Sequence, residues 1–351
     1  MADLWGPSHR PFYLLGMGPR RKLLYRDGTL SDLHTGEVLR SWHATAELIE
    51  PCDYSVRLDT PAGEVTLTED EEGVWTVGPG GRELHTSGEV HLPRFGDDQR
   101  AGVLRALHQE ILVNIGAGRP LPNLLVYPRP WYRDAAMVML CLARTGNLGA
   151  VRPWVLGIEE PFDRNNAGCR EPDNLGQVLL MVSLVADATH PIVPRVLAEA
   201  RKARDGAGIR GLTDLAEHPV YQTKWLKLGL RALGLEDDYV IPAVPDSYSN
   251  LFWMDFRDEH VATDPFGPDA LRDYPYLNWA EAHFHQAPAP ETLRVDRYPF
   301  TRERNASQAD YGHMSRIDPA LAAARTAVPH SWHAAEAFLY HWHDVPGRDA
   351  P

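Results

Sequence analysis

A motif of aromatic and charged residues, Trp131-Tyr132-Arg133-Asp134, stands directly before a run of apolar residues. If that run forms a helix, Asp134 lies near its positive N-terminal end, beside Arg133. The two rings can stack on a sugar or on another flat apolar face. The simpler interpretation is that Asp134 caps the helix and pairs with Arg133. A cap needs no aromatic neighbours, so the pattern favours a functional carboxylate.

A second segment, residues 159–177, is crowded with carboxylates, arginines and amides and also leads into an apolar run. Acid–base chemistry on a neutral substrate needs one carboxyl group that stays protonated and one that is ionised. We expect Glu171 or Asp173 to be the general acid, although Asp173 is also placed to cap the following helix. An ion-paired surface loop would explain the same composition.

The partner of such an acid is a carboxylate that activates water. Three positions later in the chain are candidates for this base: Asp310, Glu281 and Glu336. An inverting mechanism requires the acid and the base to lie roughly 6.5–9.5 Å apart, so that a water fits between them. The spacing along the chain selects none of the three, and a solvated loop carboxylate is the alternative for Asp310.

Aromatic residues are dense between positions 246 and 285, where Tyr248, Trp253 and Trp279 could form a binding wall. Such rings offer flat apolar faces to a ligand. Core packing explains Trp253 and Trp279 equally well. Both interpretations of this segment stay open.

A Pro-His-Ser-Trp-His motif at residues 329–333 precedes the last apolar segment. Histidine titrates near neutrality, so His330 and His333 could act as acid and base. His330, His333 and Glu336 recur every three residues and could share one helix face, but this spacing matches no known metal site. We therefore expect the polar rim of a cleft here, with no metal ion and no cofactor.

The composition disfavours several classes of function. The 351 residues include 35 Lys and Arg against 48 Asp and Glu, and the net charge of −13 argues against binding to nucleic acid. No window approaches ~20 consecutive apolar residues, so we expect no contact with a membrane. Three widely spaced cysteines indicate a reducing compartment, by default the cytoplasm. The sequence contains no phosphate-binding loop and no serine nucleophile elbow.

Two kinds of segment must position these residues. Over residues 1–95, β-branched and aromatic runs, from Phe12–Leu15 to Glu89–Leu92, alternate with turn signals, which predicts a small antiparallel β domain. From residue 96 the apolar residues follow a 3.6-residue repeat, and the predicted helices include 247–256 and 276–285. Helices that are apolar on nearly all sides, as over 135–143 and 175–185, alternate with amphipathic ones, as over 191–204. This alternation predicts a mainly α protein whose residues 96–351 form an α/α toroid carrying the active site.

The motifs at residues 131–134 and 329–332, each before a predicted helix, resemble those of the six-hairpin glycosidase superfamily. The resemblance implies an (α/α)6 barrel, complete or incomplete. It implies inverting hydrolysis or phosphorolysis of glycosidic bonds, with lyases and epimerases on related toroids. It also implies that Asp134 contacts the substrate.

We therefore expect a carbohydrate-active enzyme, an inverting glycoside hydrolase with a carboxylate pair that acts on a short soluble saccharide or glycoside. The alternative is a sugar epimerase, isomerase or lyase in which two histidines are acid and base. A saccharide-binding module is less expected, because binding alone does not need so many carboxylates. The expected catalytic residues are Asp134, Glu171, Asp173, Glu281, Asp310 and Glu336. The expected substrate-binding residues are Trp131, Tyr132, Arg133, Asn165, Asn166, Gln177, Tyr248, Trp253, Trp279, His330, Trp332 and His333.

Overall fold

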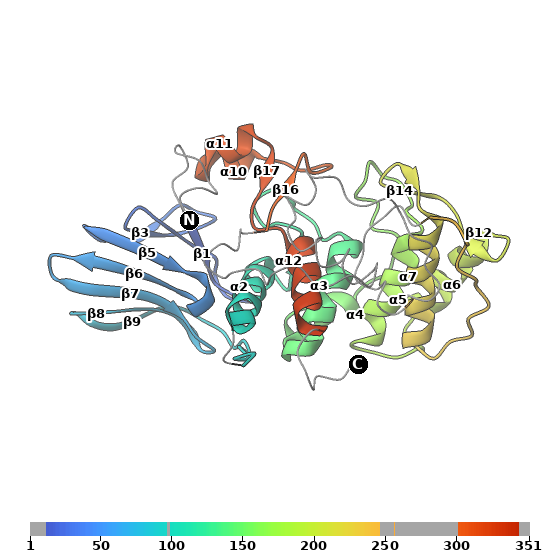
Figure 1. Cartoon of the computed structure of the whole chain (residues 1–351), viewed down its shortest axis with the longest axis horizontal. Coiled ribbons are helices and arrows are strands. Elements are labelled where there is room, and N and C mark those ends of the chain that lie inside the picture. Colours follow the sequence, from blue (N-terminus) through green and yellow to red (C-terminus); the bar gives the residue numbers. More distant parts are fainter. Residues whose placement is uncertain (1–11, 97–98, 246–255, 257–300, 344–351) are drawn as a thin grey trace.

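The computed structural model of the chain describes residues 12–96, 99–245, 256 and 301–343, and every structural statement below concerns these residues. Helices account for 36% of the residues and strands for 23%. Two antiparallel sheets form one end of the molecule, and the helices extend from them in a row (Figure 1). The protein therefore combines a β part and an α part of comparable weight.

Each sheet is a simple meander in which strands adjacent in sequence pair antiparallel. Alternating burial along β7 shows that one face of the second sheet packs inward and the other faces water. The first sheet comprises β1 (Phe12–Leu15), β2 (Leu23–Arg26), β3 (Thr29–Asp32) and β4 (Val38–Ser41). The second comprises β5 (Ala46–Glu50), β6 (Ser55–Thr60), β7 (Gly63–Glu69), β8 (Gly73–Gly78) and β9 (Gly81–Ser87).

The predicted antiparallel strands are present, with three differences. Strand β9 was not predicted because it is a mostly exposed edge strand without alternating apolar residues. Strand β3 was missed because it holds a single large apolar residue, Leu30. The predicted strand over residues 89–92 is wrong, since that segment forms no strand.

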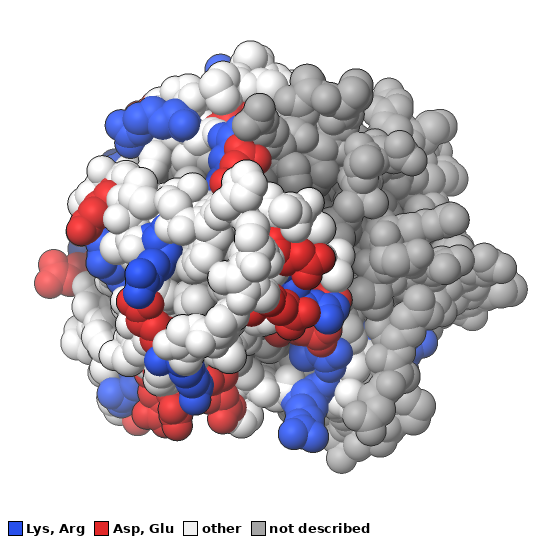
Figure 2. Space-filling view, turned by 90° about the vertical axis from the view of Figure 1, so that its left-hand side faces the viewer, with Lys and Arg blue, Asp and Glu red and all other residues white. Residues whose placement is uncertain are grey.

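Buried side chains from both sheets form one apolar cluster, so the sheets pack on each other as a small sandwich. Tyr13 and Tyr25 from the first sheet meet Leu58 and Leu67 from the second in this cluster. On this end of the molecule, side chains of both charges lie next to one another (Figure 2). Exposed ion pairs such as Arg40–Glu83 contribute little to stability.

The other face of the first sheet packs against α2 (Gln99–Val113). Leu14 and Met17 belong to the same buried cluster as Leu107 of the helix. The Gln109 side chain also donates a hydrogen bond of 2.6 Å to the Leu14 carbonyl. The predicted boundary at residue 95 falls in the segment before α2, and the apolar core continues across it.

The main helices lie side by side in the order α2, α12, α3, α5 and α7, with α6 packed against α5 (Figure 1). Gly146, with φ of 75°, ends α3 in the left-handed conformation typical of a helix C-terminus. Their bounds are α3 (Tyr132–Thr145), α5 (Asp173–Ser183), α6 (Ile192–Lys202), α7 (Pro219–Ala232) and α12 (Ser331–His343). Shorter helices are α4 (Arg152–Leu156), α10 (Gly312–Ile317) and α11 (Pro319–Ala323).

The prediction of a mainly α toroid is wrong, because the helices form a row beside substantial sheets. Helices α3 and α5 are buried on most sides, as expected from their sequences. Each has a neighbouring helix on both flanks of the row, so a helix needs no closed ring to be covered. The predicted helices over 247–256 and 276–285 lie outside the described residues, apart from Phe256.

Four pairs of two-residue strands lie in the helical part, of which the first three are hairpins and the fourth joins segments far apart in the chain. They are β10 (Ile115–Gly116) with β11 (Arg119–Pro120), β12 (Arg204–Asp205) with β13 (Gly208–Ile209), β14 (Leu212–Thr213) with β15 (Ala216–Glu217), and β16 (Glu303–Arg304) with β17 (Thr326–Ala327). Within the described ranges, every helix is too short or too polar to cross a lipid bilayer.

The closest approach of two helices in the row is between α5 and α7, where Gly176 faces the backbone of Trp225. A Cβ atom at Gly176 would overlap that backbone, which cannot move aside as a flexible side chain can. We expect Gly176→Ala to lower the free energy of unfolding by about 2 kcal/mol or more, as overpacked cores do. Urea denaturation measures the loss. The control is Gly149→Ala, where an added Cβ meets open space; equal effects of both variants would contradict this packing.

Candidate active site

The motifs at residues 131–134 and 329–333, about 200 positions apart in the chain, meet at one cavity of about 270 Å³. The cavity has charged residues beside aromatic ones, a composition typical of sites that orient a small polar ligand. Its walls include Pro122, Tyr127, Trp131, Arg133, Asp134, Asp214, Glu303, Asn305, Ser307, His330, Trp332 and His333.

Local structure explains how Asp134 and His330 reach the same cavity. Asp134 lies in the first turn of α3, and His330 directly precedes α12, which packs against α3. The turn before α12 is held by Asn123, whose side chain donates to the Pro329 carbonyl at 2.6 Å. Both helices thus begin at the cavity and direct the positive ends of their dipoles toward it.

A short β ladder brings in a third ionisable group, Glu303. Strand β16 pairs with β17 so that Glu303 lies opposite Ala327. Ala327 is three residues before His330 in the chain. Glu303 Oε2 forms an ion pair with His330 Nε2 at 2.5 Å. Asp134 Oδ1 lies 4.0 Å from the same nitrogen. The two carboxylate oxygens therefore cannot be more than 6.5 Å apart, the sum of these distances.

The two carboxyl groups of this trio differ in protonation. Burial raises the pKa of Asp134 to about 7, against the opposing effect of His330. Its Oδ1 atom is buried and has no hydrogen-bond partner among the described residues. Burial would also raise the pKa of Glu303, but the charge and hydrogen bond of His330 outweigh it and lower the pKa to about 2. Asp134 thus keeps its proton up to near-neutral pH, whereas Glu303 is ionised.

The pKa values of the two histidines are also shifted in opposite directions. Burial lowers the pKa of His330, but Glu303 and Asp134 together raise it above its ordinary value. The pKa of His333 falls to about 3, through burial and the neighbouring His330 charge. Their ring centroids lie 5.2 Å apart. The cavity therefore holds a cationic and a neutral imidazole side by side.

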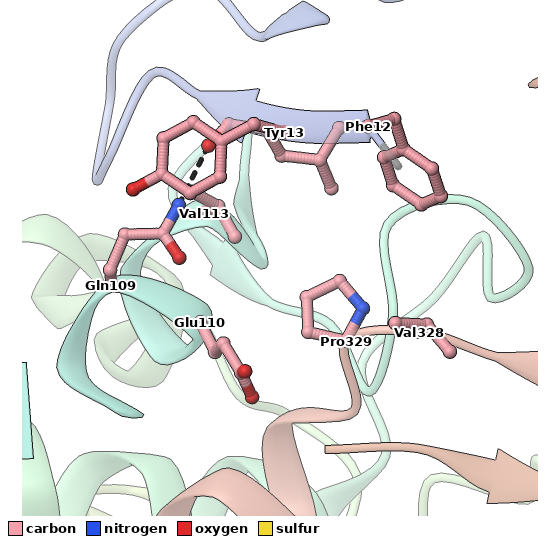
Figure 3. Close-up of a pocket in the computed structure, with 8 residues that line it drawn as sticks. Phe12, Tyr13, Gln109, Glu110, Val113, Val328 and Pro329 are labelled. Carbon is pink, nitrogen blue, oxygen red and sulfur yellow. Dashed lines mark hydrogen bonds between the residues drawn. The ribbon is translucent and has the colours of Figure 1, made fainter. Parts of the chain in front are cut away.

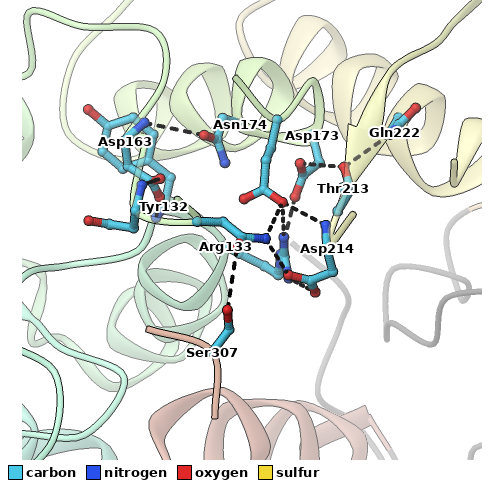
Figure 4. Close-up of polar contacts among 12 residues, drawn as sticks. Tyr132, Arg133, Asp163, Asp173, Asn174, Thr213, Asp214, Gln222 and Ser307 are labelled. Carbon is cyan, nitrogen blue, oxygen red and sulfur yellow. Dashed lines mark hydrogen bonds and ion pairs between the residues drawn. The ribbon is translucent and has the colours of Figure 1, made fainter. Parts of the chain in front are cut away.

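Arg133, next to Asp134, forms ion pairs with three carboxylates (Figure 4). Its guanidinium lies 3.4 Å from Glu171 and 3.2 Å from Asp173, and it also contacts Asp214. Burial raises the pKa of Glu171 to about 7, although Arg133 opposes the shift. A proton on Glu171 therefore reduces the repulsion among the three carboxylates that contact this arginine.

The tip of the β14–β15 hairpin is fixed by this cluster. Asp214 and Leu215 both have positive φ, of 49° and 66°, which is unusual for a leucine. The Asp214 amide donates to Glu171 at 2.6 Å, and the Thr213 hydroxyl donates to Asp173 at 2.8 Å. These contacts hold Asp214, whose side chain is 34% exposed, in the cavity wall.

Several residues predicted to act in catalysis do not line the cavity. Asp173 is the first residue of α5, and its side chain pairs with Arg133 and accepts hydrogen bonds from Gln177 and Thr213. Glu336 accepts a hydrogen bond from the Trp332 indole at 3.1 Å. Asp310 is exposed and accepts from the backbone of Gly312 at 2.8 Å. Glu171 belongs to the Arg133 cluster, and Glu281 lies outside the described residues.

Among the residues predicted to bind substrate, Trp131, Arg133, His330, Trp332 and His333 line the cavity. Four others support the adjoining loops. The Tyr132 hydroxyl donates to the Glu160 carbonyl, Asn165 to the Pro130 carbonyl, Asn166 to Glu171 and Asp214, and Gln177 to Asp173. Tyr248, Trp253 and Trp279 lie outside the described residues.

Sequence reasoning missed Glu303 and Asp214. Glu303 belongs to the two-residue strand β16, and Asp214 lies in the turn between β14 and β15. Neither residue directly precedes a long apolar run, as the other motifs do. The sequence analysis selected Asp310 from this part of the chain, and Glu303 lies seven residues before it. The sequence Arg302-Glu303-Arg304 is the local feature that could have marked Glu303. Such a charged run has no periodicity that would predict a strand or a site.

The chain matches no protein-family model, no curated protein and no solved structure. Among the described residues, His, Cys, Asp and Glu form no group of three or more arranged to hold a metal ion.

We expect Asp134→Asn to become progressively more stable relative to the wild type as the pH rises from about 4 to 6.5. A carboxyl group with a raised pKa loses its proton first in the unfolded chain, so wild-type stability falls over this range by roughly 2–3 kcal/mol. The variant has no such proton. Urea unfolding of both proteins across the range measures the difference, and a constant difference would show that folded Asp134 is ionised.

Proposed function

We propose that the protein is a carbohydrate-active enzyme that hydrolyses a glycosidic bond in a small saccharide or glycoside. The observation that carries the proposal is a pair of carboxyl groups, Asp134 and Glu303, that line one cavity beside His330. Burial raises the pKa of Asp134 to about 7, whereas His330 lowers the pKa of Glu303 to about 2. Glycosidases use such a pair, with one group as the acid and the other as nucleophile or base. Residues of the two motifs that resemble those of six-hairpin glycosidases line this cavity, although the chain does not have the toroid fold of that superfamily.

In this mechanism each residue has a distinct task. Asp134 donates its proton to the departing glycosidic oxygen, and Glu303 stabilises or attacks the anomeric carbon. The buried environment of Asp134 keeps the proton available at near-neutral pH. Rings of Trp131 and Trp332 offer faces for the apolar side of a sugar. The volume of about 270 Å³ suits a short substrate.

The geometry favours retention of configuration over the inversion expected from the sequence. The Asp134 and Glu303 oxygens are at most 6.5 Å apart, at the lower edge of the inverting range. Retaining enzymes place their carboxyl groups about 5–5.5 Å apart, which this limit includes. We therefore propose a covalent glycosyl intermediate on Glu303, formed as Asp134 protonates the leaving group and then released by water.

A second candidate function follows from the histidines. His330 is cationic and His333 is neutral in the same cavity, the states required of an acid and a base. Such a pair could move a proton between carbon and solvent, as in a sugar epimerase, isomerase or lyase. Reaction in deuterated water separates the two candidates, because only proton transfer at carbon places deuterium in recovered substrate or in the isomer.

We also propose a cytoplasmic protein without a nucleic-acid partner. The net charge of −13 disfavours phosphate backbones. The three cysteines are free thiols, as is usual in a reducing compartment.

The central test is turnover of a panel of glycosides by the wild type, Asp134→Asn and Glu303→Gln. We expect kcat to fall at least about 100-fold in both variants, since each removes a group that acts in the transition state. Wild-type activity should decline above about pH 7, because the acid form of Asp134 is then lost. Asp310→Asn, an exposed carboxylate outside the cavity wall, is the matched control. Full activity of Asp134→Asn would exclude the mechanism.

The stereochemical outcome is measured separately by following the anomeric proton of the first product with NMR. Retention is expected from the short separation of the carboxyl groups. Initial release of the opposite anomer would instead indicate direct attack by water and a more distant base.

A further inference from the structure

Glu110 of α2 is buried, with 1% of its surface exposed. Its carboxyl group does not line the cavity but contacts Thr301, two residues before Glu303. It extends from the helix toward the chain at Pro329 (Figure 3). The adjoining space between β1, α2 and Pro329 measures about 20 Å³, enough for about one water molecule. The space is too small for a substrate, so the carboxyl group serves the protein itself.

The contacts of Glu110 connect it to both ends of the Glu303–His330 pair. Its Oε2 atom contacts the Thr301 hydroxyl and lies 3.2 Å from the Thr301 amide nitrogen. The same hydroxyl lies 3.0 Å from both the backbone nitrogen and the carbonyl oxygen of His330. Because Thr301 precedes Glu303 by two residues, one hydroxyl group joins the two catalytic segments.

The hydrogen bonds of the Thr301 hydroxyl differ between the neutral and the ionised form of Glu110. The hydroxyl accepts from the His330 amide and has one hydrogen of its own to donate. If Glu110 is a neutral acid, it donates to Thr301, and Thr301 donates to the His330 carbonyl. If Glu110 is ionised, Thr301 donates to Glu110, and the His330 carbonyl keeps only the Ala334 amide, 3.0 Å away, as its donor. The neutral form therefore adds a second hydrogen bond between Thr301 and the His330 backbone.

The electrostatics also favour the neutral form. Burial raises the pKa of Glu110 to about 8, although hydrogen bonds from Thr301 oppose the shift. An ionised carboxylate at this depth would need a charged partner. The neutral acid needs only the hydrogen bonds it already makes.

We propose that Glu110 is a positioning residue which, through Thr301, holds Glu303 and His330 at ion-pair distance. This inference rests on the proposed function, since the pair matters only if the cavity is catalytic. The role requires a neutral donor and acceptor rather than a charge. Glutamine offers both with the same length, whereas alanine offers neither.

The test is the titration of the His330 imidazole, followed by NMR in the full-length protein. In Glu110→Ala and Thr301→Val the pair loosens, and the pKa of His330 should fall by about one unit or more. In Glu110→Gln and Thr301→Ser the hydrogen bonds persist, and the titration should match the wild type. His333, Asp134 and the Tyr127 ring also face His330 and are unchanged in all four variants.

Gln109→Ala is the matched control, because it removes a buried hydrogen bond from the adjacent position of α2 toward β1. A purely structural role for Glu110 would make both alanine variants lower the melting temperature with the His330 titration unchanged, and this would overturn the proposal. Thr301→Val gives the same comparison where Glu110→Ala fails to fold. The titration needs no turnover, so it is decided separately from the glycosidase activity.

Discussion

Arg133 shares one positive charge among three buried or half-buried carboxylates, and the geometry of the candidate site depends on this arrangement. The partners come from the loop before α5, from the first residue of α5 and from the β14–β15 hairpin. Their excess negative charge engages the arginine and leaves little of its field for its neighbour in sequence. Asp134 is therefore governed by burial, and its pKa rises although a guanidinium stands one residue away. Arg133 is best understood as a structural anchor that shapes the cavity wall through Asp214.

A second ion pair lies close to Asp134, whose Oδ1 atom is 4.0 Å from His330 Nε2. Glu303 and His330 keep each other charged, which gives the cavity a carboxylate without leaving an isolated buried charge. The neutral proton donor thus lies near two groups of compensated charge. Removal of either member of the pair would expose Asp134 to an unbalanced charge and shift its proton affinity. Effects of mutations at these positions should consequently not be additive.

Sequence analysis identified the parts of this site that belong to helix starts and missed the parts that depend on tertiary contacts. Asp134 and His330 precede long apolar helices, and such local patterns survive whatever the wider fold is. Glu303 belongs to a two-residue strand whose pairing with residues 326–327 leaves no periodic signal. Glu171 and Asp173 were plausible acids by composition, but an arginine 38 and 40 positions earlier binds both. Charge pairing at that separation is not visible along a chain.

The error in the fold has a related physical cause. Burial on all sides requires neighbours on all sides, and a row of helices against a sheet provides them as well as a ring does. The strands of the N-terminal part were predictable because side-chain alternation and turns are local. The role of these strands was not predictable, because it depends on tertiary packing. The first sheet covers α2, and Glu110 of α2 contacts Thr301. The β part thus contributes to the site without lining the cavity, because it shields α2 from water. From α2 the buried Glu110 contacts Thr301, and Thr301 in turn accepts a hydrogen bond from the His330 backbone.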